Sequence, residues 1–481
     1  MKSAMKSALK SDNQIFDIVI IGSGPAGQKA AIQAAKAGKK VAICEQAREV
    51  GGACVHQGTI PSKALRERAV ERYRAGQRFA ELRSARNLYR GGIAELIGEM
   101  THIIHAHDHY MSEQLTRNGI VIVHGRASFD DPHTLRVRHT DGSTSQLRTE
   151  FVVIATGSKP RAPANIAIDH EHIYDSDSLL SMAYLPQTLL VLGGGVIACE
   201  YASVFALLGV QVTLVDRYPR PLGFLDSDLT DRFIEYFEQH GGVFIGEADV
   251  ERVVFDGLSQ VESTFRDGSI LRTDKAMCAL GRISQIDGLR IENSGVRVND
   301  RQLIEVNECG RTNVPHIYAA GDVVGPPSLA SASMEQGRRV ACDILGVGAG
   351  RFSEFIPTGI YSVPELASVG LTEVQATQKF PGTVVGRANF KEIARGQIAQ
   401  SQEGMLKLVV TPDRRVVGVH AVGTFATELV HIGQMAMLNN GLIDIFIENV
   451  FNFPTYAESY RVAALDASGA LMRAAGQQAV A

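Results

Sequence analysis

Two stretches of the chain share one order of apolar and polar positions. In the first, the unbroken apolar run of residues 15–21 predicts a parallel strand buried on both faces. A glycine-rich turn follows, then an alanine-rich segment that predicts a helix up to Ala37, and a second apolar run, Val41–Cys44. Residues 188–216 repeat this order. The pattern predicts two separate strand–helix–strand units.

The first turn carries the glycine spacing of a dinucleotide-binding motif. Gly22 permits the tight turn, Gly24 lets the backbone approach a pyrophosphate, and Gly27 allows close packing of helix and strand. Glu45 ends the second strand and can accept the hydroxyl hydrogens of an adenosine ribose. A glycine-rich turn can be purely structural, but the helix, both strands and the terminal acid together favour a dinucleotide site.

The second turn has the same spacing with one change. Gly193 and Gly195 are followed by Ala198 at the third position, and Asp216 ends the second strand. Two dinucleotide sites in one chain suggest one cofactor that stays bound and one coenzyme that exchanges.

The residues after this strand give mixed signals on the coenzyme. Asp216 is the acid expected for the 2′-hydroxyl of NAD, whereas a nearby arginine such as Arg217 or Arg220 can hold the 2′-phosphate of NADP. Both arginines could instead be solvated loop charges. Their position directly after the acid favours a site that accepts both coenzymes.

Composition narrows the class of protein. A chain of 481 residues suggests about three domains. A net charge of −4 gives no general attraction to nucleic acid or to acidic membranes, and no apolar run has the length of a membrane span. Residues 1–14 contain lysines but no apolar core of a signal peptide, so we expect a flexible tail.

Cysteine and histidine spacing argues against a metal site. The six cysteines show no clustered spacing, which is typical of a reducing compartment and predicts a cytoplasmic protein. Three histidines at helical spacing lack an acid or cysteine that would complete a ligand set, so we expect an ordinary helix there: His102, His105 and His109.

Four further motifs carry a family resemblance. They are GGACVHQGTIPSKAL at Gly51–Leu65, ATG at Ala155–Gly157, ALGR at Ala279–Arg282 and YAAGD at Tyr318–Asp322. In this order they resemble the pyridine nucleotide–disulfide oxidoreductases, over residues 17–471. The resemblance implies an α/β fold with two Rossmann-like domains, for FAD and NAD(P), and an α+β carboxyl-terminal dimerisation domain of a homodimer.

The resemblance also implies domain boundaries. We expect residues 15–160 and 286–350 to form the FAD-binding domain, residues 161–285 the NAD(P)-binding domain, and residues 351–481 the dimerisation domain. In the last of these, Met405–Gly423 predicts a hairpin. The helix after it has a predicted apolar face made of Leu429, Ile432, Met435 and Ala436.

Two departures from the family pattern bear on the activity. Disulfide reductases of this family have two cysteines separated by four residues, whereas here Cys54 is kept and Thr59 stands at the second position. A threonine cannot form a disulfide, so the dithiol relay is missing. The family histidine near the carboxyl end is replaced by Phe453, although Glu458 is kept.

This combination resembles the soluble, flavin-containing pyridine nucleotide transhydrogenases. The implied reaction is NADPH + NAD⁺ = NADP⁺ + NADH, by a ping-pong mechanism that needs close alignment but no general base. An NAD(P)H dehydrogenase or diaphorase that reduces a quinone, and a flavoprotein subunit without turnover, stay open as alternatives.

The resemblance assigns roles to single residues. Lys63 is expected beside the flavin, paired with Glu200, as the catalytic pair. Cys54 is expected to pack against the flavin, and Asp322 to bind its ribityl chain. The helix that begins near Leu329 and Ala330 should point its amino terminus at the flavin. Other expected cofactor contacts are Gly51, Gly52, Thr59, Thr156, Gly157 and Gly281, although Thr156 and Gly157 could form a plain β-turn.

Overall fold

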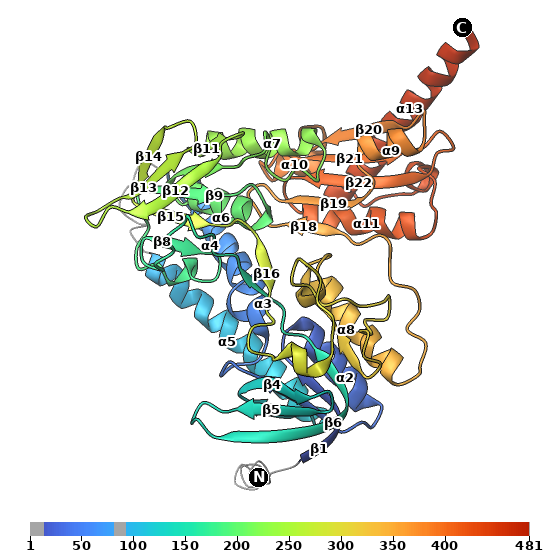
Figure 1. The fold of residues 1–481 in the computed structure, drawn as a ribbon. Coiled ribbons are helices and arrows are strands. Elements are labelled where there is room, and N and C mark those ends of the chain that lie inside the picture. The colour runs from blue at the N-terminus through green and yellow to red at the C-terminus, as the bar shows by residue number, and fades with distance from the viewer. Residues whose placement is uncertain (1–13, 81–92, 481) are drawn as a thin grey trace.

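The computed structural model describes residues 14–80 and 93–480. The predicted tail falls on residues 1–14, of which residues 1–13 lie outside the described part, and Gln14 begins the first strand. The described strands form five sheets; in Figure 1 the seven-stranded sheet lies at the bottom, and the two five-stranded sheets lie side by side above it.

The first sheet has seven strands in the order β3-β2-β1-β6-β5-β4, with β17 paired to β6. The apolar run predicted as a strand is β1, which lies parallel to both β2 and β6. Its strands are β1 (Gln14–Ile21), β2 (Val41–Glu45), β3 (Val121–His124), β4 (Arg126–Asp131), β5 (Thr134–Arg138), β6 (Thr144–Ile154) and β17 (Ile317–Ala319). The helices that accompany it are α2 (Pro25–Lys36), α3 (Gly52–His56), α4 (Thr59–Ala80), α5 (Ile93–Arg117) and α8 (Ala330–Ile344).

Helices α2 and α8 pack backbone against backbone. A Cβ atom on Gly337 of α8 would lie 2.0 Å from the carbonyl oxygen of Ala26 on α2, so only glycine fits at this crossing. The contact joins residues far apart in the chain and fixes α8 beside the first glycine turn.

The second sheet has the order β11-β10-β9-β15-β8 and is parallel where its pairings are described. Its strands are β8 (Ile173–Asp175), β9 (Thr188–Leu192), β10 (Gln211–Val215), β11 (Val243–Ile245) and β15 (Lys275–Cys278), and its helices are α6 (Val196–Leu207) and α7 (Ser227–Gln239). A small antiparallel sheet follows: β12 (Val250–Phe255), β13 (Val261–Phe265) and β14 (Ile270–Thr273). Strands β7 (Ser158–Pro160) and β16 (Arg282–Ser284) pair and connect this region to the first sheet (Figure 1).

The third sheet is antiparallel, in the order β18-β19-β22-β21-β20. Its strands are β18 (Thr358–Ile360), β19 (Leu366–Gly370), β20 (Val384–Asn389), β21 (Met405–Val410) and β22 (Val416–Val422). Its helices are α9 (Glu373–Lys379), α10 (Ala394–Ile398), α11 (Ala426–Leu438), α12 (Asp444–Glu448) and α13 (Ser459–Val480). The predicted hairpin is β21–β22, but the predicted apolar face of α11 is wrong at Met435, which is 52% exposed. Val430 and Met437 are buried instead, because the buried face is rotated around the helix.

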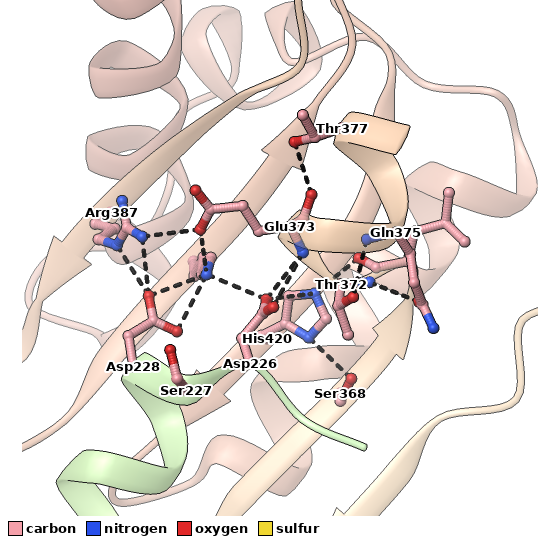
Figure 2. A network of polar contacts seen from close by, with 12 residues as sticks. Asp226, Ser227, Asp228, Ser368, Thr372, Glu373, Gln375, Thr377, Arg387 and His420 are labelled. Carbon is pink, nitrogen blue, oxygen red and sulfur yellow. Dashed lines mark hydrogen bonds and ion pairs between the residues drawn. The ribbon is translucent and has the colours of Figure 1, made fainter. Parts of the chain in front are cut away.

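An ionic cluster around the buried side chains of Lys407 and Asp226 joins the second and third sheets (Figure 2). Lys407 of β21 is 1% exposed, and its Nζ lies within 3.1 Å of Asp226 and Asp228, before and within α7, and of Glu373 in α9. Burial opposes the charge on Lys407, but hydrogen bonds to Glu373 and Asp228 outweigh it and raise its pKa. The cluster holds the start of α7 against the third sheet.

His420 of β22 lies at the edge of this cluster, with Nε2 3.8 Å from Asp226 (Figure 2). Its Nε2 is 3.0 Å from the carbonyl oxygen of Leu371, and its Nδ1 is 2.8 Å from Ser368 Oγ. Burial lowers the pKa of His420, against the opposing effect of Asp226. The neutral ring therefore donates to Leu371 and accepts from Ser368.

Within the described residues, every helix is too short or too polar to cross a bilayer. The expected helix around the three histidines is α5. His109 Nε2 lies 3.2 Å from Glu113, and the described part of the chain contains no group of three histidine, cysteine or acidic side chains able to hold a metal ion.

Candidate active site

One large cavity of about 2200 Å³ runs past both glycine turns. A single ligand pocket usually measures about 300–1,000 Å³, so this cavity has room for more than one small molecule. Most of the predicted site residues line it: Gly22, Gly24, Glu45, Gly52, Cys54, Thr59, Lys63, Thr156, Gly157, Gly193, Gly195, Glu200, Asp216, Arg217, Gly281, Asp322, Leu329 and Ala330. Four others do not line it: Gly27, Gly51, Ala198 and Arg220.

The glycines of the first turn differ in what surrounds them. Gly22 has φ +104°, and its Cβ would lie 2.4 Å from the carbonyl oxygen of Ala155. A Cβ on Gly27 would lie 2.0 Å from the oxygen of Gly22, so Gly27 serves helix–strand packing rather than the cavity. Around Gly24, the residue before α2, a Cβ would meet nothing within 4 Å. The open space therefore lies at the amino terminus of α2, where unpaired N–H groups favour an anion.

Glu45 is held by hydrogen bonds from its own unit. Its Oε2 accepts from the backbone N (2.9 Å) and Oγ (2.6 Å) of Ser23, and its Oε1 accepts from Ala47 N (2.8 Å). Ser23 Oγ also accepts from Gly51 N at 3.0 Å, which ties the segment before α3 to the first turn. Sequence reasoning missed Ser23; its position between two motif glycines was the available signal.

The second turn repeats the geometry of the first. Gly193 has φ +105°, and its Cβ would lie 2.7 Å from the oxygen of Ala279, while a Cβ on Gly195 would meet nothing within 4 Å. Ala198 lies within α6, is fully buried and serves packing. Gly194 was missed: a Cβ there would lie 2.1 Å from Asp216 Oδ2, so the middle one of the three consecutive glycines makes room for the acid.

Asp216 and the two arginines after β10 are placed differently. Burial raises the pKa of Asp216 above its usual value, against the opposing backbone N–H groups of Tyr218, Arg217 and Gly194. Arg217 stacks on Tyr218, with its Cζ 4.8 Å from the ring centroid. Arg220 forms an ion pair with Asp231 of α7 and lies outside the cavity lining. The structure thus places Arg217, and not Arg220, at the cavity.

Lys63 and Glu200 meet across the two dinucleotide units, which confirms the predicted pairing. Lys63 Nζ, on α4, lies 2.7 Å from Glu200 Oε2 on α6, and the glutamate side chain is only 7% exposed. Tyr361 N donates to Glu200 Oε1 at 2.8 Å, and the Tyr361 ring centroid lies 5.0 Å from Lys63 Nζ. Tyr361 comes from the segment after β18, and sequence reasoning missed it.

Cys54 lies in the cavity wall, in the middle of α3, without a second thiol bonded to it. All six cysteines are free. Burial raises the pKa of the Cys54 thiol, against the opposing effects of a hydrogen bond with Thr59 and of the charge on Lys63. A thiol that keeps its proton is a poor nucleophile, so this cysteine is suited to packing rather than to exchange chemistry.

A polar chain links Asp322 to the second unit. Ser158 Oγ donates to Asp322 Oδ2 at 2.7 Å and accepts from Arg282 Nε at 2.9 Å, and Arg282 Nη1 donates to Asp177 Oδ1 at 2.7 Å. Ser158 lies on β7 and Arg282 on β16, the two strands that connect the units, so the chain of hydrogen bonds passes through this connection. Arg282 belongs to the ALGR motif, but its role in this chain was not foreseen.

The remaining predicted contacts surround the same space. Leu329 precedes the first residue of α8, Ala330, so the helix begins at the cavity wall. Gly157 and Gly281 have φ +71° and +98°, at the two places where the chain passes between the units. Thr156 Oγ1 is buried without a hydrogen-bond partner in the described protein.

Two dinucleotides suit this arrangement. The space that a Cβ would fill at Gly24 and again at Gly195 gives each turn an open cradle at a helix amino terminus. An acid stands beyond each cradle, Glu45 in the first unit and Asp216 in the second. The residues of the first unit would hold FAD, and those of the second a nicotinamide coenzyme.

The Phe453–Glu458 segment lies apart from this cavity in the same chain. Phe453 is 69% exposed and does not line the cavity. Glu458 Oε2 accepts from Thr455 N at 3.3 Å, which closes a capping box. Nothing in one chain alone brings Phe453 to Cys54.

Comparison with known families defines the class. The chain matches the pyridine nucleotide-disulphide oxidoreductase family over residues 16–337 and the dimerisation domain of that family over residues 356–464. It belongs to this family of flavoprotein oxidoreductases.

Within this family, the chain is similar to named transhydrogenases over almost its whole length. The chain is 42% identical to the soluble pyridine nucleotide transhydrogenase of Pseudomonas putida (strain W619), over 94% of this chain and 98% of that protein. It is 41% identical to the soluble pyridine nucleotide transhydrogenase of Mycobacterium tuberculosis (strain ATCC 25177 / H37Ra), over 94% and 97%.

Solved structures share the fold. The HOCl-induced flavoprotein disulfide reductase RclA of Escherichia coli, in its Cu(II) complex, superposes with a TM-score of 0.86 at 28% identity, over 94% of this chain and 99% of that one. LpdA of Mycobacterium tuberculosis gives a TM-score of 0.86 at 26% identity, over the same shares of the two chains.

Proposed function

We propose that the chain binds FAD in its first unit and catalyses NADPH + NAD⁺ = NADP⁺ + NADH by a ping-pong mechanism. One observation carries the proposal: two dinucleotide cradles open onto one cavity, and beside Cys54 in that cavity Thr59 stands where disulfide reductases of the family have their second cysteine. The transhydrogenase relatives, at 41–42% identity over 94% of the chain, support it.

In this reaction the protein aligns the two dinucleotides and provides a charged group beside them. Bound FAD supplies a centre that accepts a hydride from one coenzyme and returns it to the next. The two cradles would align two dinucleotides along one cavity, and Lys63, held by Glu200, would present its ammonium group there. Cys54 has no bonded partner thiol, so no disulfide competes with the coenzyme as an electron acceptor.

Both coenzymes can use the second unit in turn. In this proposal Asp216 accepts from the 2′-hydroxyl of NAD(H) and Arg217 binds the 2′-phosphate of NADP(H); both residues line the cavity. A nicotinamide site shared by both coenzymes is what a ping-pong exchange requires.

We further propose a homodimer built through residues 351–481, with the Phe453–Glu458 segment at the partner's flavin site. The match to the family's dimerisation domain and the exposure of Phe453 support this arrangement. Residues 15–160 and 286–350 then form the FAD-binding domain and residues 161–285 the NAD(P)-binding domain. Six unpaired cysteines favour a cytoplasmic location.

The test is hydride transfer without a mediator. Purified flavin-loaded protein is mixed anaerobically with NADPH and thio-NAD⁺, whose reduced form absorbs at a distinct wavelength, with and without a quinone. We expect thio-NADH to form at the same rate in both mixtures. Electron transfer only to the quinone would identify a diaphorase, and failure of NADPH to bleach the flavin would identify a subunit without turnover.

A second arm tests the missing dithiol. Lipoamide and glutathione disulfide should stay unreduced by the wild-type protein. Thr59→Cys should also leave them unreduced, because Phe453 supplies no proton-handling group. Rapid reduction of either disulfide by the wild-type protein would contradict the proposal.

A further inference from the structure

Arg217 and Tyr218 form a pair at the coenzyme end of the cavity. The guanidinium lies over the Tyr218 ring at 4.8 Å, and Arg217 Nη2 donates to Tyr218 Oη at 2.9 Å. Both residues line the cavity, and Tyr218 is 55% exposed. The guanidinium thus contacts its neighbour's ring and forms no ion pair with Asp216, although its charge counteracts the rise in the pKa of that carboxyl.

The backbone beneath this pair is fixed, whereas the side chains face the cavity. Asp216 N donates to Ile245 O at 3.0 Å, Ala248 N to Asp216 O at 3.0 Å, and Glu247 N to Tyr218 O at 3.2 Å. These bonds tie the end of β10 to the segment after β11. Any rearrangement of Arg217 on ligand binding must come from its side chain.

A site for both coenzymes has two opposing demands. The 2′-hydroxyl of NAD(H) needs an unengaged carboxylate, and the 2′-phosphate of NADP(H) needs an unengaged cation. An ion pair between Arg217 and Asp216 would occupy both groups at once. Arg220 offers no substitute, because Asp231 holds it outside the cavity lining.

We propose that Tyr218 is a specificity-determining residue, which keeps Arg217 away from Asp216 so that each side chain serves one of the two coenzymes. The proposal rests on the proposed transhydrogenase function and adds the means by which one site accepts both substrates. Asp216 takes the 2′-hydroxyl while Arg217 stays on the tyrosine ring. Arg217 turns from the ring to the phosphate when NADP(H) enters.

The test measures binding of two ligands that carry only the adenosine end. ADP has the 2′-hydroxyl and 2′,5′-ADP has the 2′-phosphate, and both are titrated calorimetrically into flavin-loaded protein. In Tyr218→Leu, the released Arg217 pairs with Asp216, so the Kd of ADP should rise about two- to fivefold. Arg217→Leu should weaken 2′,5′-ADP by about tenfold or more, because it removes a charge-assisted contact to phosphate.

A double-mutant cycle separates this role from simple stacking of the adenine on Tyr218. In the Arg217→Leu background no guanidinium is released, so Tyr218→Leu should leave the Kd of ADP unchanged. An equal loss of ADP affinity in both backgrounds would show that the ring acts on the ligand, and no loss in either would show that it does nothing. Both results overturn the proposal.

Tyr184 provides the matched control. Its ring centroid lies 5.0 Å from Lys275 Nζ, and the residue is 58% exposed in the same unit but outside the cavity. Tyr184→Leu should change neither Kd. The titrations involve no hydride transfer, so they test the role of Tyr218 separately from the reaction. If the double-mutant cycle gives the expected Kd changes but the protein shows no transhydrogenation, only the proposed function is refuted. If the protein catalyses transhydrogenation but Tyr218→Leu leaves the Kd of ADP unchanged, only the role of Tyr218 is refuted.

Discussion

The two dinucleotide units share one backbone arrangement but differ in the surroundings of the acid that follows or ends the second strand. In the first, Glu45 accepts three hydrogen bonds from Ser23 and Ala47 and is only 6% exposed. In the second, Asp216 lies beside backbone N–H groups and is followed by the exposed Arg217 and Tyr218. A preorganised acid suits a cofactor that stays bound, and an acid with movable neighbours suits a coenzyme that exchanges.

The units also differ in how they are anchored. The first is held by close backbone packing of α2 against α8, where Gly337 meets Ala26. The second is held against the third sheet by the charges around Lys407 (Figure 2).

The largest effect is expected from the first glycine of each turn. Gly22→Ala places a Cβ 2.4 Å from a carbonyl oxygen at φ +104°. Gly193→Ala places one 2.7 Å from a carbonyl oxygen at φ +105°. We expect Gly22→Ala to retain less than about a tenth of the wild-type FAD content, and Gly193→Ala to retain FAD but bind coenzyme at least about tenfold more weakly. FAD absorbance and NADH titration measure the two quantities.

The glycines that end the helices serve as controls. Gly38 and Gly209 follow α2 and α6 with φ +81° and +90°, but a Cβ there would meet nothing within 4 Å. Gly38→Ala and Gly209→Ala test positive φ alone and should keep both ligands. Equal loss of FAD in Gly22→Ala and Gly193→Ala would contradict the assignment of one dinucleotide to each unit.

Lys407→Met tests the ionic anchor of the second unit. It leaves the buried Asp226 and its neighbours without their shared cation, so the free energy of unfolding should fall by about 3 kcal/mol. Urea denaturation measures the loss, with the exposed Lys391→Met as control. Unfolding at the wild-type urea midpoint would show that the cluster does not anchor α7.

Lys63→Met tests the contact between the units. The substitution removes the charge-assisted hydrogen bond to Glu200 and the positive charge at the cavity, so flavin reduction by NADPH should slow by about ten- to a hundredfold. Stopped-flow absorbance measures the rate. Lys63→Arg keeps the charge and should recover part of it, whereas a Lys63→Met rate equal to wild type would remove the pair from the catalytic machinery.

The parts of the site that the sequence predicted are local ones. Gly22, Gly24 and Glu45 follow from an apolar run, a turn and a strand end within one short segment, and the same holds for Gly193 and Asp216. Periodicity does not fix the rotation of a helix whose neighbours are unknown, and so Met435 of α11 was placed on the wrong face.

The parts that were missed depend on contacts between distant segments. Tyr361 reaches Glu200 because the third sheet docks beside α6, and Arg220 is drawn from the cavity by Asp231 of α7. Neither contact has a local sequence signal. Pairing of Lys63 with Glu200 was accessible only because the family motifs supplied what spacing could not.

The smallest expected effect is a pH dependence of coenzyme preference in the second unit. Burial raises the pKa of Asp216, so its carboxyl gains a proton at a higher pH than an ordinary aspartate. Protonation weakens the carboxyl as an acceptor for a 2′-hydroxyl and removes its repulsion of a 2′-phosphate. As the pH falls through this pKa, the affinity for 2′,5′-ADP relative to ADP should therefore rise by about fivefold. The phosphate titrates too, but it does so equally in Asp216→Asn, so the difference between wild-type and variant profiles isolates the carboxyl. Superimposable profiles would mean that Asp216 does not discriminate between the two coenzymes, and the contrast with Glu45, which accepts three hydrogen bonds within its own unit, would lose its functional meaning.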